Sequence, residues 1–184
     1  TSAAMPAVFA AALAGLGALV LVAQSRQAQA PAAIPYCILG DSAAAVGGPI
    51  DLIDQNGARV TPADFAGEPA VLYFGFTHCP DVCPLSLNLL GEALALPGGY
   101  DVQAALVSLD PGRDTPAAMG AYVRTAGFPA GLIGLTGTQA QVESARRAFQ
   151  VFAAPAAGAD RSAYNIDHSS MIYLLDRQWR TVAI

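Results

Sequence analysis

The sequence predicts an α/β fold in which helices cover a sheet that contains parallel strand pairs. The first observation behind this prediction is that apolar runs of strand length alternate with segments of helical period from Pro49 onward. The second observation is that turn residues and helix-start residues stand between these segments, where they would separate the elements. The chain has 184 residues, which is enough for one ordinary domain and a tail.

The expected order of elements is a hairpin, three strand–helix units and a second hairpin. Strands are expected at residues 50–54, 58–61, 70–76, 102–110, 131–137, 169–176 and 179–184, and helices at residues 84–96, 114–127 and 138–152. The first hairpin follows from Asn56-Gly57, which is a preferred two-residue turn. The Thr-Pro-Ala-Asp run at 61–64 then signals a helix start.

The strand–helix units are justified by apolar runs and capping signals. The continuous apolar run at 70–76 is typical of a buried central strand. In the helix after it, Leu85, Leu89 and Ala93 recur at helical spacing. Thr115-Pro116 starts the second helix, which Gly127 can end. A Thr-x-x-Gln capping box at residue 138 opens the third helix.

The first 25 residues differ from the rest because they contain no charged side chain. The apolar run from Ala3 to Val22 has about 20 residues, enough to cross a hydrocarbon core of roughly 30 Å as a helix. We therefore expect a single transmembrane anchor at 1–25, a linker rich in Ala, Pro and Gly at 26–48, and a folded domain at 49–184. A cleaved signal peptide ending near Ala30 and a buried soluble helix are the alternatives.

Cys79 and Cys83 form the most reactive cluster of the chain. They lie four residues apart, after the strand expected at 70–76 and at the start of the helix expected at 84–96. This spacing places both sulfurs on one face of a helical turn. The partial positive charge of a helix N-terminus favours thiolate over thiol. The carboxyl end of a strand is also where an α/β sheet carries its functional groups.

Three readings of the pair are open from the residues alone: a structural disulfide, a redox pair and part of a metal site. A metal site needs a third ligand, and the chain has only two histidines. His78 adjoins Cys79, so its side chain should point elsewhere, whereas His168 could swing over the pair from a turn before a strand. A lone histidine in that place is also commonly structural. Two sulfurs and one nitrogen would suit Cu(I), while Zn(II) would call for a fourth ligand.

Two further residues have open roles. Asp110 belongs to the polar turn "SLDPGRDTP", where a turn function and a position near the cysteine loop are both compatible with the sequence. Cys37 is unpaired by spacing, and it is either incidental or a partner for mixed disulfides. The net charge of -5 gives little electrostatic support for nucleic-acid binding.

Four segments together resemble one known family. "YFGFTHCPDVCPLSL", "LVSLDPGRDTP", "GLIGLTGT" and "IDHSSMIYLLD", in this order, are similar to the Sco/SenC (PrrC-like) family of copper-binding cytochrome c oxidase assembly proteins. The resemblance runs from about Gly47 to Asp176. It implies a thioredoxin-like domain held by one N-terminal membrane helix. It also implies that Cys79, Cys83 and His168 bind copper as Cu(I), and in some states as Cu(II).

The resemblance also implies a function. We expect a membrane-anchored copper chaperone, rather than a true enzyme, for the binuclear copper site of cytochrome c oxidase subunit II. One alternative is a thiol–disulfide oxidoreductase in which Cys79 and Cys83 reduce the oxidase cysteines. Another is an accessory subunit of a respiratory oxidase, bound through a helix face containing Gly15 and Gly17. The expected place is the bacterial inner membrane with the domain in the periplasm, or the mitochondrial inner membrane facing the intermembrane space.

Overall fold

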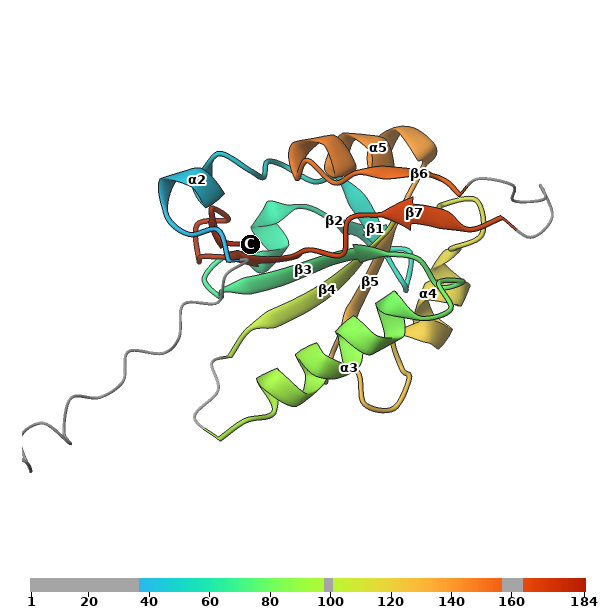
Figure 1. The fold of residues 1–184 in the computed structure, drawn as a ribbon, viewed down its shortest axis with the longest axis horizontal. Coiled ribbons are helices and arrows are strands. Elements are labelled where there is room, and N and C mark those ends of the chain that lie inside the picture. Colours follow the sequence, from blue (N-terminus) through green and yellow to red (C-terminus); the bar gives the residue numbers. More distant parts are fainter. Residues whose placement is uncertain (1–36, 98–100, 157–163) are drawn as a thin grey trace, which may run out of the picture. The chain divides into compact units, whose positions relative to one another are not determined.

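The computed structural model describes residues 37–97, 101–156 and 164–184 (Figure 1). In these residues the main sheet has seven strands in the order β2-β1-β5-β4-β3-β8-β9. Its three central strands are parallel and its outer strands pair antiparallel. The strands are β1 (Leu52–Asp54), β2 (Arg59–Val60), β3 (Ala70–Gly75), β4 (Gln103–Ser108), β5 (Ile133–Thr136), β8 (Ile172–Leu175) and β9 (Thr181–Ala183). The predicted mixed α/β sheet is confirmed.

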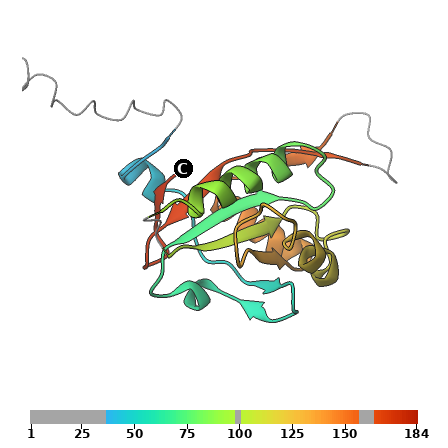
Figure 2. The same ribbon diagram turned by 90° about the horizontal axis from the view of Figure 1, so that it is seen from below.

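Helices cover both faces of this sheet (Figures 1 and 2). The elements are α2 (Asp41–Ala44), the 3₁₀ helix η1 (Pro62–Phe65), α3 (Val82–Leu94), α4 (Pro116–Tyr122) and α5 (Gln139–Ala148). On one face, Leu87 of α3 and Met119 of α4 pack with Leu106 of β4. On the other face, Val142 of α5 packs with Phe74 of β3. The sheet therefore separates two apolar cores, and the core under α3 contains both cysteines of the predicted site.

The predicted turn and capping signals act as expected. Asp54 Oδ1 accepts hydrogen bonds from the backbone N–H groups of Asn56 and Ala58, which closes the β1–β2 turn. Thr138 and Gln141 form the reciprocal capping box that opens α5. All six residues of β3 are buried, as a central strand between two cores requires.

Three details differ from the sequence prediction. Helix α4 ends at Tyr122 instead of Gly127, because the Thr125 hydroxyl donates to the Tyr122 carbonyl at 2.7 Å and helps to end the helix there. A two-stranded sheet of β6 (Ala153–Pro155) and β7 (Ile166–His168) was not predicted. Strand β8 then begins at Ile172, after residues 169–171 have linked it to β7.

The apolar residues of α3 fall into two groups. Leu87 and Leu90, together with Cys83, are buried against the sheet. Leu85 and Leu89, which recur at helical spacing in the sequence, are instead 60% and 57% exposed. Leucine occupies so much of the circumference of α3 that periodicity alone does not select the buried face.

The N-terminal part of the prediction is only partly covered by the structure. The transmembrane anchor expected at 1–25 lies outside the described residues. Among residues 37–97, 101–156 and 164–184, no helix has the length and apolar character needed to cross a membrane. Within the segment expected to be a linker, the backbone of Ile38 pairs with Ile184, and Ala43 of α2 is buried. Residues 38–43 therefore contact the domain at its β9 edge.

Candidate metal centre

The two cysteines are positioned by the end of β3 and the start of α3. Cys79 lies in the loop between these elements, where its backbone N–H donates to the Phe76 carbonyl at 3.2 Å. Cys83 lies in the first turn of α3, and its backbone N–H donates to Cys79 Sγ at 3.4 Å. Pro84 follows within that first turn, where a missing N–H breaks no helical hydrogen bond. The chain path therefore directs both sulfurs to the same side.

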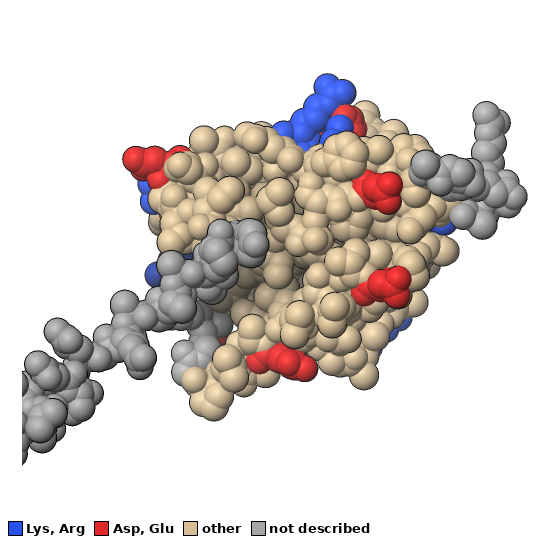
Figure 3. Space-filling view, in the orientation of Figure 1, with Lys and Arg blue, Asp and Glu red and all other residues tan. Residues whose placement is uncertain are grey.

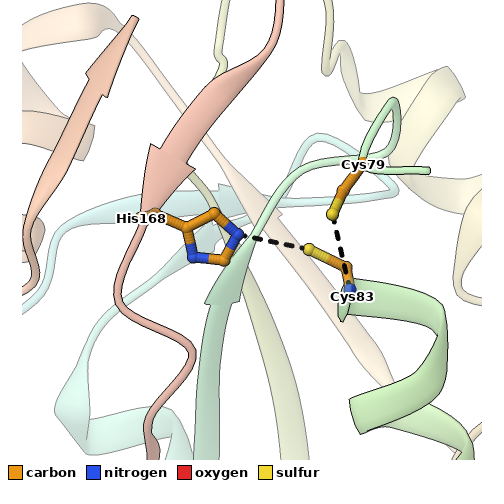
Figure 4. Close-up of side chains that lie close together, drawn as sticks. All are labelled: Cys79, Cys83 and His168. Atoms are coloured by element: carbon orange, nitrogen blue, oxygen red, sulfur yellow. Dashed lines mark hydrogen bonds between the residues drawn. The ribbon is translucent and has the colours of Figure 1, made fainter. Parts of the chain in front are cut away.

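His168 joins the cysteines from the far end of the domain sequence. It is the last residue of β7, and its Nε2 lies 3.5 Å from Cys83 Sγ (Figure 4). Its Nδ1 lies 2.9 Å from the Ser169 carbonyl oxygen. Because a carbonyl only accepts, Nδ1 carries the proton and Nε2 presents its lone pair to the cysteines. The ligand atoms of Cys79, Cys83 and His168 all lie within 4.8 Å of one another.

Burial controls the chemistry of this cluster before any metal binds. Cys83 is fully buried and Cys79 is 8% exposed. Burial, followed by the hydrogen bond with Cys79, raises the pKa of Cys83 to about 12. The expectation that the helix N-terminus favours a Cys83 thiolate is therefore wrong for the metal-free protein, because desolvation outweighs the helix dipole. A bound cation would supply the charge that a buried thiolate needs.

Aromatic rings hold the imidazole from two sides. The ring centroid of Phe76 lies 5.8 Å from that of His168, and the ring centroid of Tyr73 lies 6.5 Å away, both edge-on. Gly75 lies between Tyr73 and Cys83, since a Cβ at Gly75 would be 2.8 Å from Cys83 Sγ. The site therefore has closely packed walls and little freedom to expand on this side.

The site opens to solvent on its other side. A cavity of about 330 Å³ lies between residues 79–82 of the cysteine loop and residues 165–168 around β7. Cys79 and His168 line this cavity, whereas the buried Cys83 lies behind them. Figure 3 shows that the face of the molecule seen in Figure 1 carries few charged side chains. Because Cys79 and His168 line the cavity and Cys83 is buried, a ligand or partner that enters the cavity would reach Cys79 and His168 first.

The other residues considered from the sequence lie outside the ligand cluster. His78 is half-exposed, and its Nδ1 contacts Thr77 Oγ1 at 3.0 Å, so it points away as predicted. Asp110 is buried but directed to Arg113 and Tyr164. Cys37 is an exposed free thiol.

Sequence reasoning missed the buried carboxylate of Asp114. This fully buried side chain accepts hydrogen bonds from Thr77 Oγ1 and Ser108 Oγ, both at 2.6 Å. Burial raises the pKa of Asp114 above its usual value. The contacts tie the loop that leads to Cys79 to the turn after β4. In the sequence Asp114 looks like an ordinary residue before a helix start, so no local pattern marks this role.

Two thiols and one imidazole nitrogen define the chemistry that the centre can perform. Thiolate sulfur and imidazole nitrogen suit a soft cation of low coordination number such as Cu(I). Four protein ligands are usual for a structural Zn(II) site. The paired thiols could also exchange with a disulfide. Fold and site together define a class of α/β proteins that carry a metal-binding dithiol at the start of a helix.

Comparison with known proteins identifies the family within this class. The SCO1/SenC profile matches residues 40–184, so the chain belongs to the SCO1/SenC family. An SCO2-like protein of Rickettsia conorii is 38% identical over 167 residues, which cover 89% of this chain and 80% of that protein. The human mitochondrial SCO1 homolog is 37% identical over 134 residues, covering 71% of this chain and 44% of that protein.

Solved structures confirm the thioredoxin-like Sco fold. Bradyrhizobium japonicum ScoI with copper bound has a TM-score of 0.68 and 43% identity, over 75% of this chain and 87% of that chain. Arabidopsis thaliana ScoI with copper bound has a TM-score of 0.69 and 39% identity, over 75% of this chain and 86% of that chain. The fold implied by the resemblance is therefore correct.

Proposed function

We propose that this protein is a copper chaperone that holds copper with Cys79, Cys83 and His168 and delivers it to the binuclear copper site of cytochrome c oxidase subunit II. The observation that carries the proposal is the convergence of two sulfurs and one imidazole nitrogen within 4.8 Å. The ScoI structures named above contain copper. The similar fold of BsSco belongs to a member of the Sco family of cytochrome c oxidase assembly proteins.

The geometry suits a cargo that is bound and then released. The cluster offers three ligand atoms, few enough for a further ligand to approach, and the cavity gives access to Cys79 and His168. Thiols of an acceptor could therefore approach the cargo on the open side and replace these two ligands one at a time. Cys83 would be the last ligand to release, because it lies fully buried at the back of the site. Its thiol would then recover the proton that binding had displaced.

A thiol–disulfide exchange activity is the second candidate. The observation that favours it is that the Cys79 and Cys83 sulfurs lie within 4.8 Å of each other. A disulfide would require the two sulfurs to approach to a bonding distance of about 2.05 Å. Reduction of a disulfide in the oxidase would oxidise Cys79 and Cys83 to a disulfide, which offers no thiolate to copper. The pair could therefore serve only one of the two activities at a time. The accessory-subunit hypothesis depends on residues 1–25, which the structure does not describe.

The proposed location follows from the N-terminal sequence and the relatives. We propose that residues 1–25 anchor the chain in a membrane and that the domain faces the bacterial periplasm or the mitochondrial intermembrane space. The apolar run supports the anchor. The relatives include a bacterial protein from Rickettsia conorii and mitochondrial proteins.

The copper stoichiometry of the reduced full chain tests the proposal. Cys37→Ser is used as the background, so that the exposed thiol does not bind copper itself. We expect about one Cu(I) per chain, most of which is lost in His168→Ala and retained in His78→Ala. His78 is the matched control because it is the other histidine and lies outside the ligand cluster. Equal copper retention in both histidine variants would remove His168 from the site and favour the thiol-exchange function.

A further inference from the structure

The hairpin that carries His168 is held by three residues, which we call the hairpin clamp: Asp110, Arg113 and Tyr164. The Tyr164 hydroxyl donates to Asp110 Oδ1 at 2.5 Å, and Arg113 Nη1 donates to the Tyr164 carbonyl at 3.0 Å. The Arg113 guanidinium also lies 3.7 Å from the centroid of the Tyr164 ring. Tyr164 is thus held through its hydroxyl, its ring and its backbone, four residues before His168.

The hairpin depends on side-chain contacts, such as the packing of Ala153 and Ile166 on the two cores, because no strand of the main sheet pairs with it. Within the described residues, β7 pairs only with β6, and each of these strands has three residues. A two-stranded sheet of this size is at best marginally stable by itself. At the far end of β7, Ser169 exchanges two hydrogen bonds of 3.0 Å with Phe152. These two bonds continue the pairing of β6 with β7, whereas the clamp ties the other end of β7 to the turn after β4.

Two clamp residues, Asp110 and Arg113, lie in the turn after β4 and are fixed there by further contacts. Asp110 is 4% exposed, and its backbone N–H donates to Ser108 Oγ at 2.9 Å. Arg113 makes an ion pair with Asp110 and lies over the Phe76 ring at 5.9 Å. Asp114, the next residue, binds Thr77 in the cysteine loop. One turn therefore contacts both halves of the site: the loop that leads to Cys79 and the hairpin that carries His168.

We propose that Tyr164 and Arg113 are positioning residues for His168, which hold its Nε2 toward the cysteine pair and so set the affinity for copper. This inference rests on the proposed copper site. Neither residue is within the ligand cluster, so neither touches the cargo. If the clamp opens, β7 keeps its backbone pairing with β6 and the packing of Ile166, but its N-terminal end loses its attachment to the turn after β4. His168 is then held toward Cys83 by fewer contacts, and the imidazole binds copper more weakly.

The test measures Cu(I) affinity by chelator competition in the full chain with Cys37→Ser. Tyr164→Phe removes only the hydroxyl and keeps the ring that stacks on Arg113. We expect it to weaken Cu(I) binding about tenfold, the lower end of the loss seen when a residue that orients a metal ligand is removed. Arg113→Gln removes the stacking cation, its bond to the Tyr164 carbonyl and its ion pair with Asp110, and should weaken binding at least as much. Tyr173→Phe is the matched control, since this buried hydroxyl has no hydrogen-bond partner among the described residues.

A double-mutant cycle separates positioning from a general loss of fold. Each clamp variant is combined with His168→Ala, and we expect no further loss of affinity there, because no ligand is left to position. The Cu(II) form should lose the nitrogen coupling of His168 in its electron paramagnetic resonance spectrum when the clamp is broken. Thermal unfolding of the copper-free variants checks that the domain remains folded.

Two outcomes would overturn the inference while leaving the copper site intact. One is wild-type affinity in both Tyr164→Phe and Arg113→Gln. The other is an equal loss of affinity with and without His168, which would show that the clamp acts on the fold and not through the histidine. Failure of the proposed function is recognised separately, because the parent chain would then bind no copper or His168→Ala would bind it as tightly as the parent.

Discussion

His168 Nε2 lies 3.5 Å from Cys83 Sγ, although 85 residues separate the two in the chain. The cysteines come from a local turn between β3 and α3, whereas the histidine comes from a small sheet outside the main one. The centre therefore forms only when two segments that are distant in the sequence come together. Because each candidate ligand comes from its own position in the chain, each can be tested by a separate substitution.

The three cysteines should differ sharply in their effect on copper binding. Cys79→Ser and Cys83→Ser each remove one of two sulfur ligands, so the stoichiometry should fall from about one Cu(I) per chain to near zero under chelator competition. Cys37→Ser should leave it unchanged, because Cys37 lies exposed outside the cluster. Copper bound per chain, measured after gel filtration, checks this. Retention of copper in Cys83→Ser would contradict the assigned ligand set.

Copper binding should depend on pH through Cys83. The pKa of this thiol in the copper-free protein is raised to about 12, first by burial, so it is protonated at neutral pH. Copper must displace that proton, and lower pH therefore weakens binding. We expect the Cu(I) affinity to rise roughly tenfold per pH unit for each proton released. Affinities measured by chelator competition across neutral pH test this. An affinity independent of pH would mean that no proton leaves on binding.

Gly75→Ala should disturb the site without replacing any of its three candidate ligands. The new Cβ would lie 2.8 Å from Cys83 Sγ and 3.1 Å from Tyr73 Cε1, so the thiol or the ring must move. Overpacking of this kind typically costs about 1–3 kcal/mol of unfolding free energy. Chemical denaturation gives the value. Gly120→Ala is the control, because its Cβ would meet nothing closer than 3.5 Å. Equal stability of the two variants would argue against close packing at Gly75.

Asp114→Ala should destabilise the domain and loosen the cysteine loop. It removes the acceptor of the Thr77 and Ser108 hydroxyl groups. We expect a loss of about 2–4 kcal/mol of unfolding free energy, since hydrogen bonds to a charged group contribute most. Asp51→Ala, which removes only an exposed ion pair with Arg59, should leave the unfolding free energy almost unchanged. Faster alkylation of Cys79 in Asp114→Ala would show that the cysteine loop has loosened. An unchanged rate would mean that Asp114 does not hold this loop in place.

The central sheet could be predicted because its signals are local. The apolar run of β3 and the capping box of α5 contain all the information needed to place those elements. The β6–β7 hairpin could not be predicted in this way. Its strands have three residues, and Ala153–Pro155 has no alternating pattern or β-branched residue. Its position depends on contacts such as Tyr164 with Asp110, which no local pattern encodes.

The three side chains of the candidate site could be named from the sequence, but their protonation and the residues that support them could not. Cys79, Cys83 and His168 stand in recognisable motifs, and the structure brings them together. The helix N-terminus suggested a thiolate at Cys83, but the extent of burial is a tertiary property that opposes it. The sequence also does not reveal the role of Asp114, because its partner Thr77 is 37 residues away in the chain.

The distance in sequence between the two halves of the centre has a consequence for biosynthesis. A ribosome makes Cys83 well before His168, and 85 residues at the usual rates of elongation take roughly 4 to 17 s. Strand β8, which pairs with β3, follows His168 and is made later still. A nascent chain thus displays two thiols with neither their imidazole partner nor a complete sheet behind them. The three side chains can therefore come together only after His168 has been made and β7 has formed, and any metal that needs all of them must enter the protein late in its synthesis or after it.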